Sequence, residues 1–153
     1  MPDDANPPAK PEGYGEHAKN FLNTLLDQLG LQIHPPTKKV DTLLAHVGGK
    51  YAKEHGVYDA YQQSIFEAIW KNNDSVDEKR VLSHIANKVG LDPVAFEEAL
   101  ANPTYIKQVN ADYQLAADQK IWTIPSYQGE NGILQVNHFI ELPTIDELKK
   151  IIF

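Results

Sequence analysis

Apolar residues recur at helical spacing through residues 14–118. The first stripe predicts a helix that ends before Gly30, and its members are Phe21, Leu22, Leu25, Leu26 and Leu29. A second stripe follows Thr37 and is interrupted by Gly48-Gly49, where we expect a bend or a close contact with another helix. A third stripe follows Gly56 and holds large side chains that we assign to the core, namely Tyr58, Tyr61, Ile65, Ile69 and Trp70.

Short polar motifs mark where the later helices begin. Ser75-Val76-Asp77-Glu78 has the spacing of a capping box and predicts a helix that closes at Gly90. Asp92-Pro93 and Asn102-Pro103 each place a capping residue before a proline, which predicts helices near 93–101 and 103–118. Thr144-Ile145-Asp146-Glu147 is a second capping box and predicts a short final helix.

After residue 118 the pattern changes to one that is typical of strands. Residues 121–127 and 133–140 are rich in β-branched and aromatic side chains with partial alternation, and Gly129-Glu130-Asn131-Gly132 joins them. We therefore expect a β-hairpin before the final helix, in a mostly helical α+β fold. The proline-rich residues 1–13 are expected to form a flexible arm.

Composition limits the classes of function. The 153 residues carry 14 Lys and Arg against 21 Asp and Glu, and the net charge of -7 disfavours nucleic acids and anionic membranes as partners. No apolar run approaches the roughly 20 residues that span a bilayer, and the acidic start differs from a secretion signal. We therefore expect a soluble, cytoplasmic protein with no membrane partner.

Residues with catalytic or metal-binding chemistry form few recognisable patterns. The sequence has no cysteine, and its six histidines include no pair at the spacing of a zinc protease. No serine sits in a hydrolase elbow, and no phosphate-binding loop is present. We expect no metal and no cofactor. His138 lies on the second expected strand and could approach Pro125 across the hairpin, although one imidazole does not define an acid–base site.

Several short motifs follow one another in a recognisable order. They are Leu44-Ala45-His46, Tyr51-Ala52-Lys53-Glu54-His55-Gly56, Phe66-Glu67-Ala68-Ile69-Trp70, Val81-Leu82 with Ile85-Ala86, and Ile124-Pro125-Ser126-Tyr127. In combination they resemble the DsbA-like thioredoxin family, in particular its FrnE-type cytoplasmic branch. The resemblance implies a helical insert domain over 14–118 and the C-terminal β-β-α half of a thioredoxin-like domain over 119–153.

The resemblance also implies a substrate-binding loop. In that family the proline that matches Pro125 is a cis-proline beside the active site, where neighbouring backbone pairs with a substrate peptide. Ile124, Pro125 and Ser126 are accordingly expected to form this loop, with His138 as a possible neighbour. The alternative is a trans proline at the start of an edge strand.

The family's redox motif has no counterpart in this sequence. Its members begin with a strand, a Cys-x-x-Cys helix and a second strand, whereas the present sequence matches from the helical insert onward. We therefore expect no catalytic residue in this chain and no disulfide oxidoreductase activity by the chain alone. A protein or peptide thiol would be the substrate if a redox-active segment were supplied.

Two other classes of function stay open. The chain could be a non-enzymatic interaction module or a homodimer, because a lone hairpin is marginally stable and exposes strand edges. It could also be a relative of the glutathione-dependent isomerases and transferases of the 2-hydroxychromene-2-carboxylate isomerase type.

Overall fold

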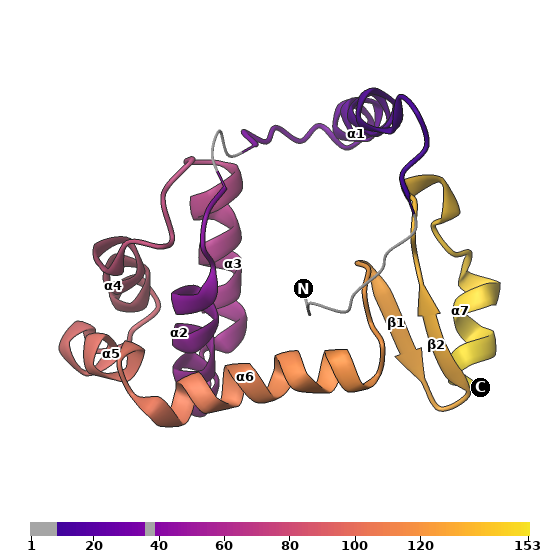
Figure 1. Cartoon of the computed structure of the whole chain (residues 1–153). Coiled ribbons are helices and arrows are strands. Elements are labelled where there is room, and N and C mark those ends of the chain that lie inside the picture. The colour runs from indigo at the N-terminus through magenta and orange to yellow at the C-terminus, as the bar shows by residue number, and fades with distance from the viewer. Residues whose placement is uncertain (1–8, 36–38) are drawn as a thin grey trace. The chain divides into compact units, whose positions relative to one another are not determined.

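The computed structural model of the chain describes residues 9–35 and 39–153 (Figure 1). The helices in these ranges are α1 (Tyr14–Leu29), α2 (Leu43–Glu54), α3 (Tyr58–Trp70), α4 (Lys79–Lys88), α5 (Pro93–Leu100), α6 (Pro103–Asp118) and α7 (Ile145–Ile152). The strands are β1 (Ser126–Gly129) and β2 (Gly132–Gln135), and a single 3-10 turn, η1, spans Phe139–Glu141. This mostly helical α+β fold confirms the class predicted from the sequence. In the described ranges no helix combines the length and the apolar character needed to cross a bilayer.

Contacts divide the chain into two compact units, which we describe separately. The helical unit is Leu31–Asp112, and the hairpin unit comprises residues 9–30 together with Tyr113–Phe153. The helix α1 therefore groups with the hairpin, and α6 contributes residues to both units. The domain boundaries implied by the family resemblance stay a prediction. Most of the expected N-terminal arm, residues 1–8, lies outside the described residues.

The helical unit is packed around α2, which runs unbroken through Gly48 and Gly49. A Cβ atom at Gly48 would overlap the Tyr61 hydroxyl and the Phe96 ring, and both of these aromatic side chains are fully buried. The glycine therefore allows α3 and α5 to press their aromatic residues against the backbone of α2. The helix is not interrupted here, and the predicted close contact with another helix is confirmed.

Most of the predicted helix caps are present. The Asp92 carboxylate accepts a hydrogen bond of 2.8 Å from the Ala95 amide, and Thr144 forms a complete capping box at the start of α7. The capping box predicted at Ser75 is wrong. There the Glu78 amide donates to the Ser75 carbonyl oxygen at 3.0 Å, so the residues make a turn and α4 begins only at Lys79.

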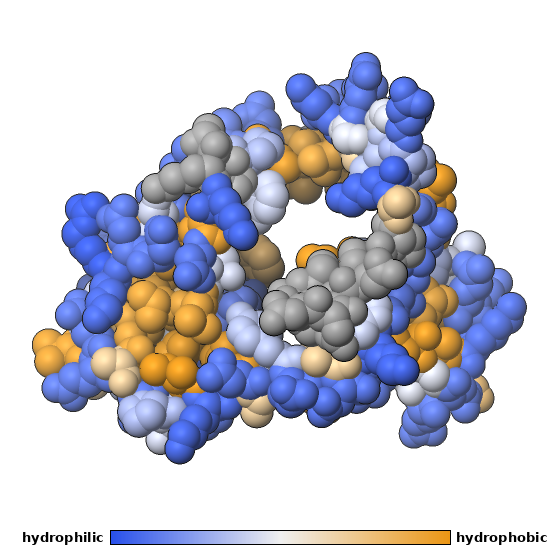
Figure 2. Space-filling view, viewed as in Figure 1, coloured by the Kyte–Doolittle hydropathy of each residue, from blue (hydrophilic) through white to orange (hydrophobic). Residues whose placement is uncertain are grey.

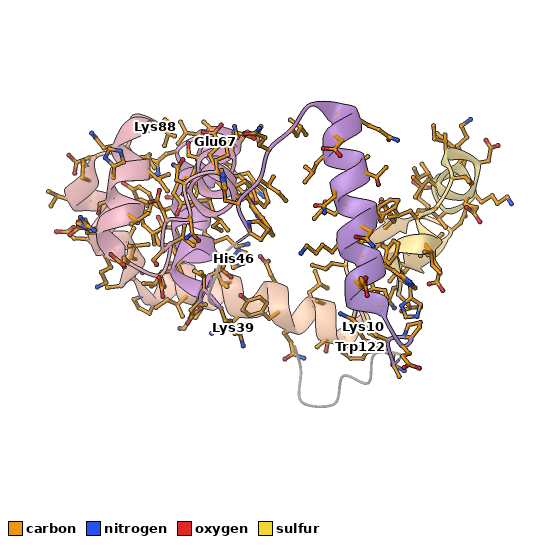
Figure 3. The ribbon with its side chains drawn as sticks, turned by 90° about the horizontal axis from the view of Figure 1, so that it is seen from above. Lys10, Lys39, His46, Glu67, Lys88 and Trp122 are labelled. Atoms are coloured by element: carbon orange, nitrogen blue, oxygen red, sulfur yellow. The ribbon has the colours of Figure 1, made fainter. Side chains whose placement is uncertain are left out.

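Polar contacts connect the helices of the helical unit at its margins. The Tyr105 hydroxyl on α6 donates to Glu54 Oε2 on α2 at 2.7 Å. Hydrogen bonding to this carboxylate, assisted by burial, raises the pKa of Tyr105 to about 12. Lys88 and Glu67 form an ion pair of 3.6 Å that links α4 to α3 (Figure 3).

The side chains of several predicted apolar stripes are only partly buried. The core assignment holds for Tyr61 and Ile65, but Tyr58 and Trp70 are exposed because they lie near the ends of α3. None of the residues of α1 is buried, and Leu29 is 59% exposed. Apolar surface is also visible over the helical unit in Figure 2.

Candidate functional site

The candidate site lies where the chain enters the hairpin of β1 and β2. The strands pair antiparallel across a two-residue turn, with Ser126 opposite Gln135 and Gly129 opposite Gly132. Helix α7 lies against this hairpin (Figure 1), and its Ile151 carbonyl occupies the space that a Cβ atom at Gly129 would need. Both strands are shorter than the 121–127 and 133–140 predicted from the sequence.

The segment before β1 is held by one side chain of β2. Gln135 Oε1 accepts a hydrogen bond of 2.8 Å from the Trp122 amide, and Gln135 Nε2 donates to the Lys120 carbonyl oxygen at 2.9 Å. Trp122, which Figure 3 labels, thus has its backbone fixed to the hairpin. The sequence analysis missed this role of Gln135. Counted from the turn of the hairpin, Gln135 lies opposite Ser126. The sequence pattern of the two strands therefore contained the information that places Gln135 beside the loop.

The loop itself is fixed on both sides of Ile124. The Ser126 hydroxyl donates to the Thr123 carbonyl oxygen at 2.6 Å, and the Val136 amide donates to the Pro125 carbonyl oxygen at 3.1 Å. The peptide bond between Ile124 and Pro125 is cis. The three residues assigned to a substrate loop therefore share one short, well-anchored turn of the backbone.

Ile124 is the outward-facing residue of this loop. Its side chain is 92% exposed, and within residues 9–35 and 39–153 no hydrogen bond involves its amide or carbonyl group. A backbone donor and a backbone acceptor are therefore open to an extended ligand, beside an apolar side chain. This is the arrangement that pairs with peptide backbone in strand-addition binding.

His138 does not lie on a strand, so that part of the prediction is wrong. It follows the end of β2 and precedes η1, with its ring centroid 5.5 Å from that of Tyr14 on α1. The Phe139 ring packs against the same Tyr14 ring at a tilt, with the ring centroids 5.4 Å apart. Packing against α1 therefore turns this segment out of the strand. Within the described residues, His138 Nδ1 and Thr123 Oγ1 are buried without a hydrogen-bond partner.

The side chains of the loop are uncharged. No charged residue occurs between Ile121 and Gly129, and the sequence offers no cysteine as nucleophile. Across the described ranges, no group of three or more histidine and carboxylate side chains is placed to hold a metal ion. Hydrogen bonding and apolar contact are what the loop offers to a ligand.

Comparisons with known proteins give three findings. A family model described as a DSBA-like thioredoxin domain matches residues 4–138. "Uncharacterized protein YwbO" of Bacillus subtilis (strain 168) is 29% identical over 86 residues, which are 55% of this chain and 43% of that protein. A solved structure of selenomethionine 2-hydroxychromene-2-carboxylate isomerase is 20% identical, with a TM-score of 0.68, over 80% of this chain and 60% of that one. The present chain thus spans less than two thirds of the length of either relative.

Proposed function

This chain belongs to the DSBA-like thioredoxin domain family, as its motifs indicated, and from that premise we propose that it supplies the substrate-holding loop of a thiol-handling protein. The ligand would be an extended protein or peptide segment that carries a thiol. The observation that supports this proposal is the open backbone of Ile124 between two anchored neighbours.

The loop is suited to this role because its anchors reduce the entropy that binding must remove. Thr123 and Pro125 are already tied by hydrogen bonds of 2.6 and 3.1 Å, so Ile124 need not be ordered by the ligand. Two backbone hydrogen bonds to the ligand would contribute about 1–3 kcal/mol in total. We therefore expect weak affinity, with dissociation constants of about 5 mM or above for short peptides.

The proposal assigns to this chain the binding of a thiol-carrying ligand, and it does not assign thiol–disulfide exchange to it. Thiol–disulfide exchange requires an attacking thiolate, and this sequence contains no cysteine. The thiolate for any exchange would come from outside this sequence. We further propose a cytoplasmic location, on the resemblance to the cytoplasmic branch of the family.

Chemical-shift titration of the isotope-labelled chain tests the binding. The probe is S-methylglutathione, a peptide whose blocked sulfur cannot react. We expect amide shifts at Ile124 and its neighbours, with Ile124→Ala weakening the affinity about three- to ten-fold because an apolar contact is lost. The matched control is Val94→Ala, another strongly exposed aliphatic residue, on α5.

Two results would contradict the proposal. One is the absence of any shift at residues 123–126 with the probe at about ten times the expected dissociation constant. The other is an equal loss of affinity in the Ile124 and Val94 variants. Insulin reduction by dithiothreitol provides a separate check, because the chain should not accelerate that reaction.

A glutathione-dependent isomerase relative is a second candidate function. The supporting observation is the fold likeness to 2-hydroxychromene-2-carboxylate isomerase, at a TM-score of 0.68. This candidate predicts retention of the chain on immobilised glutathione and no binding of an unrelated thiol-blocked peptide. The leading proposal predicts that both peptides bind with similar affinity, since backbone pairing is independent of ligand sequence.

A further inference from the structure

A small cavity lies near the start of α4, in the helical unit. Its volume is about 290 Å³, and it is lined by Asp74, Arg80, Val81 and His84. Arg80 and His84 are four residues apart on α4, so both side chains stand on one face of the helix. Asp74 comes from the segment between α3 and α4 (Figure 1) and lines the cavity from outside the helix.

The backbone holds Asp74 in place without using its carboxylate. Asn73 has a φ of 57°, which turns the chain sharply after α3. The Asp74 amide donates a hydrogen bond of 2.8 Å to the Ala68 carbonyl oxygen, and Val76, two residues further on, is fully buried. Within the described residues the Asp74 carboxylate itself has no hydrogen bond and no ion pair. A fixed carboxylate therefore remains available at the cavity.

The two opposite charges that line the cavity do not pair with each other. Among the described residues the ion-pair partner of Arg80 is Glu78, at 3.5 Å, and not Asp74. The Arg80 and Glu78 side chains are 88% and 52% exposed, so this pair contributes little and leaves guanidinium donors free. The cavity thus offers one anionic and one cationic group to a ligand.

We propose that this cavity binds a small zwitterion, namely an α-amino acid with an aliphatic side chain. The ligand carboxylate lies against the guanidinium of Arg80, whose planar fork can donate two parallel hydrogen bonds. The ligand ammonium group donates to the Asp74 carboxylate, and the aliphatic side chain packs on Val81. His84 adds a ring N–H donor on the carboxylate side, because it shares a helix face with Arg80.

A ligand with a single charge fits this set of groups less well. The first turn of α4 contains no acidic residue and begins with Lys79 and Arg80, so this end of the helix attracts anions. Asp74 opposes that attraction within the cavity, and Arg80 in turn opposes the binding of a simple cation. A zwitterion has a partner for each charge. The volume is at the lower end of the range for ligand pockets, which suits a molecule of amino-acid size.

Three probes on the wild-type chain test the need for both charges. They are L-valine, isovalerate, which is valine without its ammonium group, and isobutylamine, which is valine without its carboxylate. Chemical-shift titration of the full chain follows the amides of residues 74–84 and the Arg80 Nε signal, up to about 50 mM ligand. We expect a dissociation constant of about 1–10 mM for L-valine, because the charged groups are exposed to solvent. Each analogue should bind about five-fold more weakly.

Substitutions of the lining residues separate the two charges of the ligand. Asp74→Asn should weaken L-valine binding about five-fold and strengthen isovalerate binding, because this carboxylate attracts the ammonium group and repels a free anion. Arg80→Gln should weaken the binding of L-valine and isovalerate and strengthen that of isobutylamine. Lys79→Gln is the matched control, since it removes a neighbouring positive charge that does not line the cavity. Circular dichroism checks that each variant retains the wild-type helical signal.

Three outcomes would overturn the proposal. The first is the absence of shifts at residues 74–84 with L-valine at about 50 mM. The second is an analogue that binds as tightly as L-valine, which would mean that the cavity selects one charge only. The third is an equal loss of L-valine affinity in Lys79→Gln and Arg80→Gln, which would indicate attraction by general charge. The shifts at 74–84 belong to the helical unit and those at 123–126 to the hairpin unit, so this proposal and the proposed function can fail separately.

Discussion

The Val136 amide donates a hydrogen bond of 3.1 Å to the carbonyl oxygen of Pro125. The ladder between the two strands thus extends one residue beyond β1, into the loop that carries Ile124. Because this bond fixes the phase of the ladder, it also determines that Ser126 and Gln128 turn their backbone groups outward. One hydrogen bond therefore connects the ligand loop with the pairing of the two strands.

Gly48 should be intolerant of any side chain. We expect Gly48→Ala to lower the free energy of unfolding by about 1–3 kcal/mol, because the new methyl group would overlap Tyr61 and Phe96. Gly49→Ala is the matched control, since its nearest neighbour, a Tyr58 ring carbon, would lie at 3.4 Å. Chemical denaturation of both variants measures the difference. Equal stability of the two would contradict the close helix contact.

Two phenylalanines of the helical unit should differ sharply in their contribution to stability. Phe96 is fully buried against Tyr61 and Tyr51, and its replacement by alanine should cost about 3–5 kcal/mol. Phe66 is 51% exposed, and Phe66→Ala should cost less than about 1 kcal/mol. Urea denaturation provides the comparison. A similar loss in both variants would mean that Phe96 is not at the centre of the core.

The pKa of Tyr105 should respond to Glu54. Ultraviolet titration is expected to find a tyrosine with a pKa of about 12, and Glu54→Gln should lower that pKa toward the ordinary value of a phenol. The variant Tyr105→Phe identifies the signal. Since the folded-state pKa is raised, the stabilisation is complete below the ordinary phenol pKa. It is lost as the pH rises from there through about 12. An unchanged titration in Glu54→Gln would rule out the hydrogen bond.

Removing the capping box should destabilise α7. Thr144→Ala removes the hydroxyl that accepts from the Glu147 amide, at an expected cost of about 1 kcal/mol. Thr24→Ala on α1 is the control, because the Thr24 hydroxyl bonds only to its own helix and its loss should be nearly neutral. Thermal unfolding measures both.

The same cap should depend on pH. The backbone hydrogen bond from Thr144, followed by the bond from its hydroxyl, lowers the pKa of Glu147 below its ordinary value. The carboxylate therefore contributes its stabilisation above the ordinary pKa of a glutamate, and this is lost as the pH falls through the lowered pKa. Glu147→Gln should accordingly reduce the acid sensitivity of α7. An identical acid transition with and without the carboxylate would exclude this contribution.

Local signals were sufficient for much of the fold. Asp92 and Thr144 cap helices as predicted, because a capping residue and its target amides lie within four positions of each other. The pattern at Ser75 failed because it fits a turn as well as a helix start, and only the surrounding chain decides between them. Similarly, the glycines in α2 predicted either a bend or a close helix contact, and only the packing of the distant Phe96 against Gly48 decides between the two.

The assignment of a substrate loop to Ile124 and Pro125 stays a prediction, and the geometry of that loop was not predictable from the sequence. The direction of each backbone group depends on the pairing of β1 with β2. His138 was misplaced because its neighbours favour a strand, whereas contact with Tyr14, far away in the sequence, favours the turn. Periodicity alone could not reveal that contact.

The close approach of Gly129 to Ile151 has a consequence for the register of the hairpin. A slip of one residue in the hairpin would move Gln128 into the space beside the α7 backbone, where a side chain cannot fit. Contact between α7 and the turn therefore disfavours every shifted register of β1 against β2, so the helix helps to specify the strand pairing.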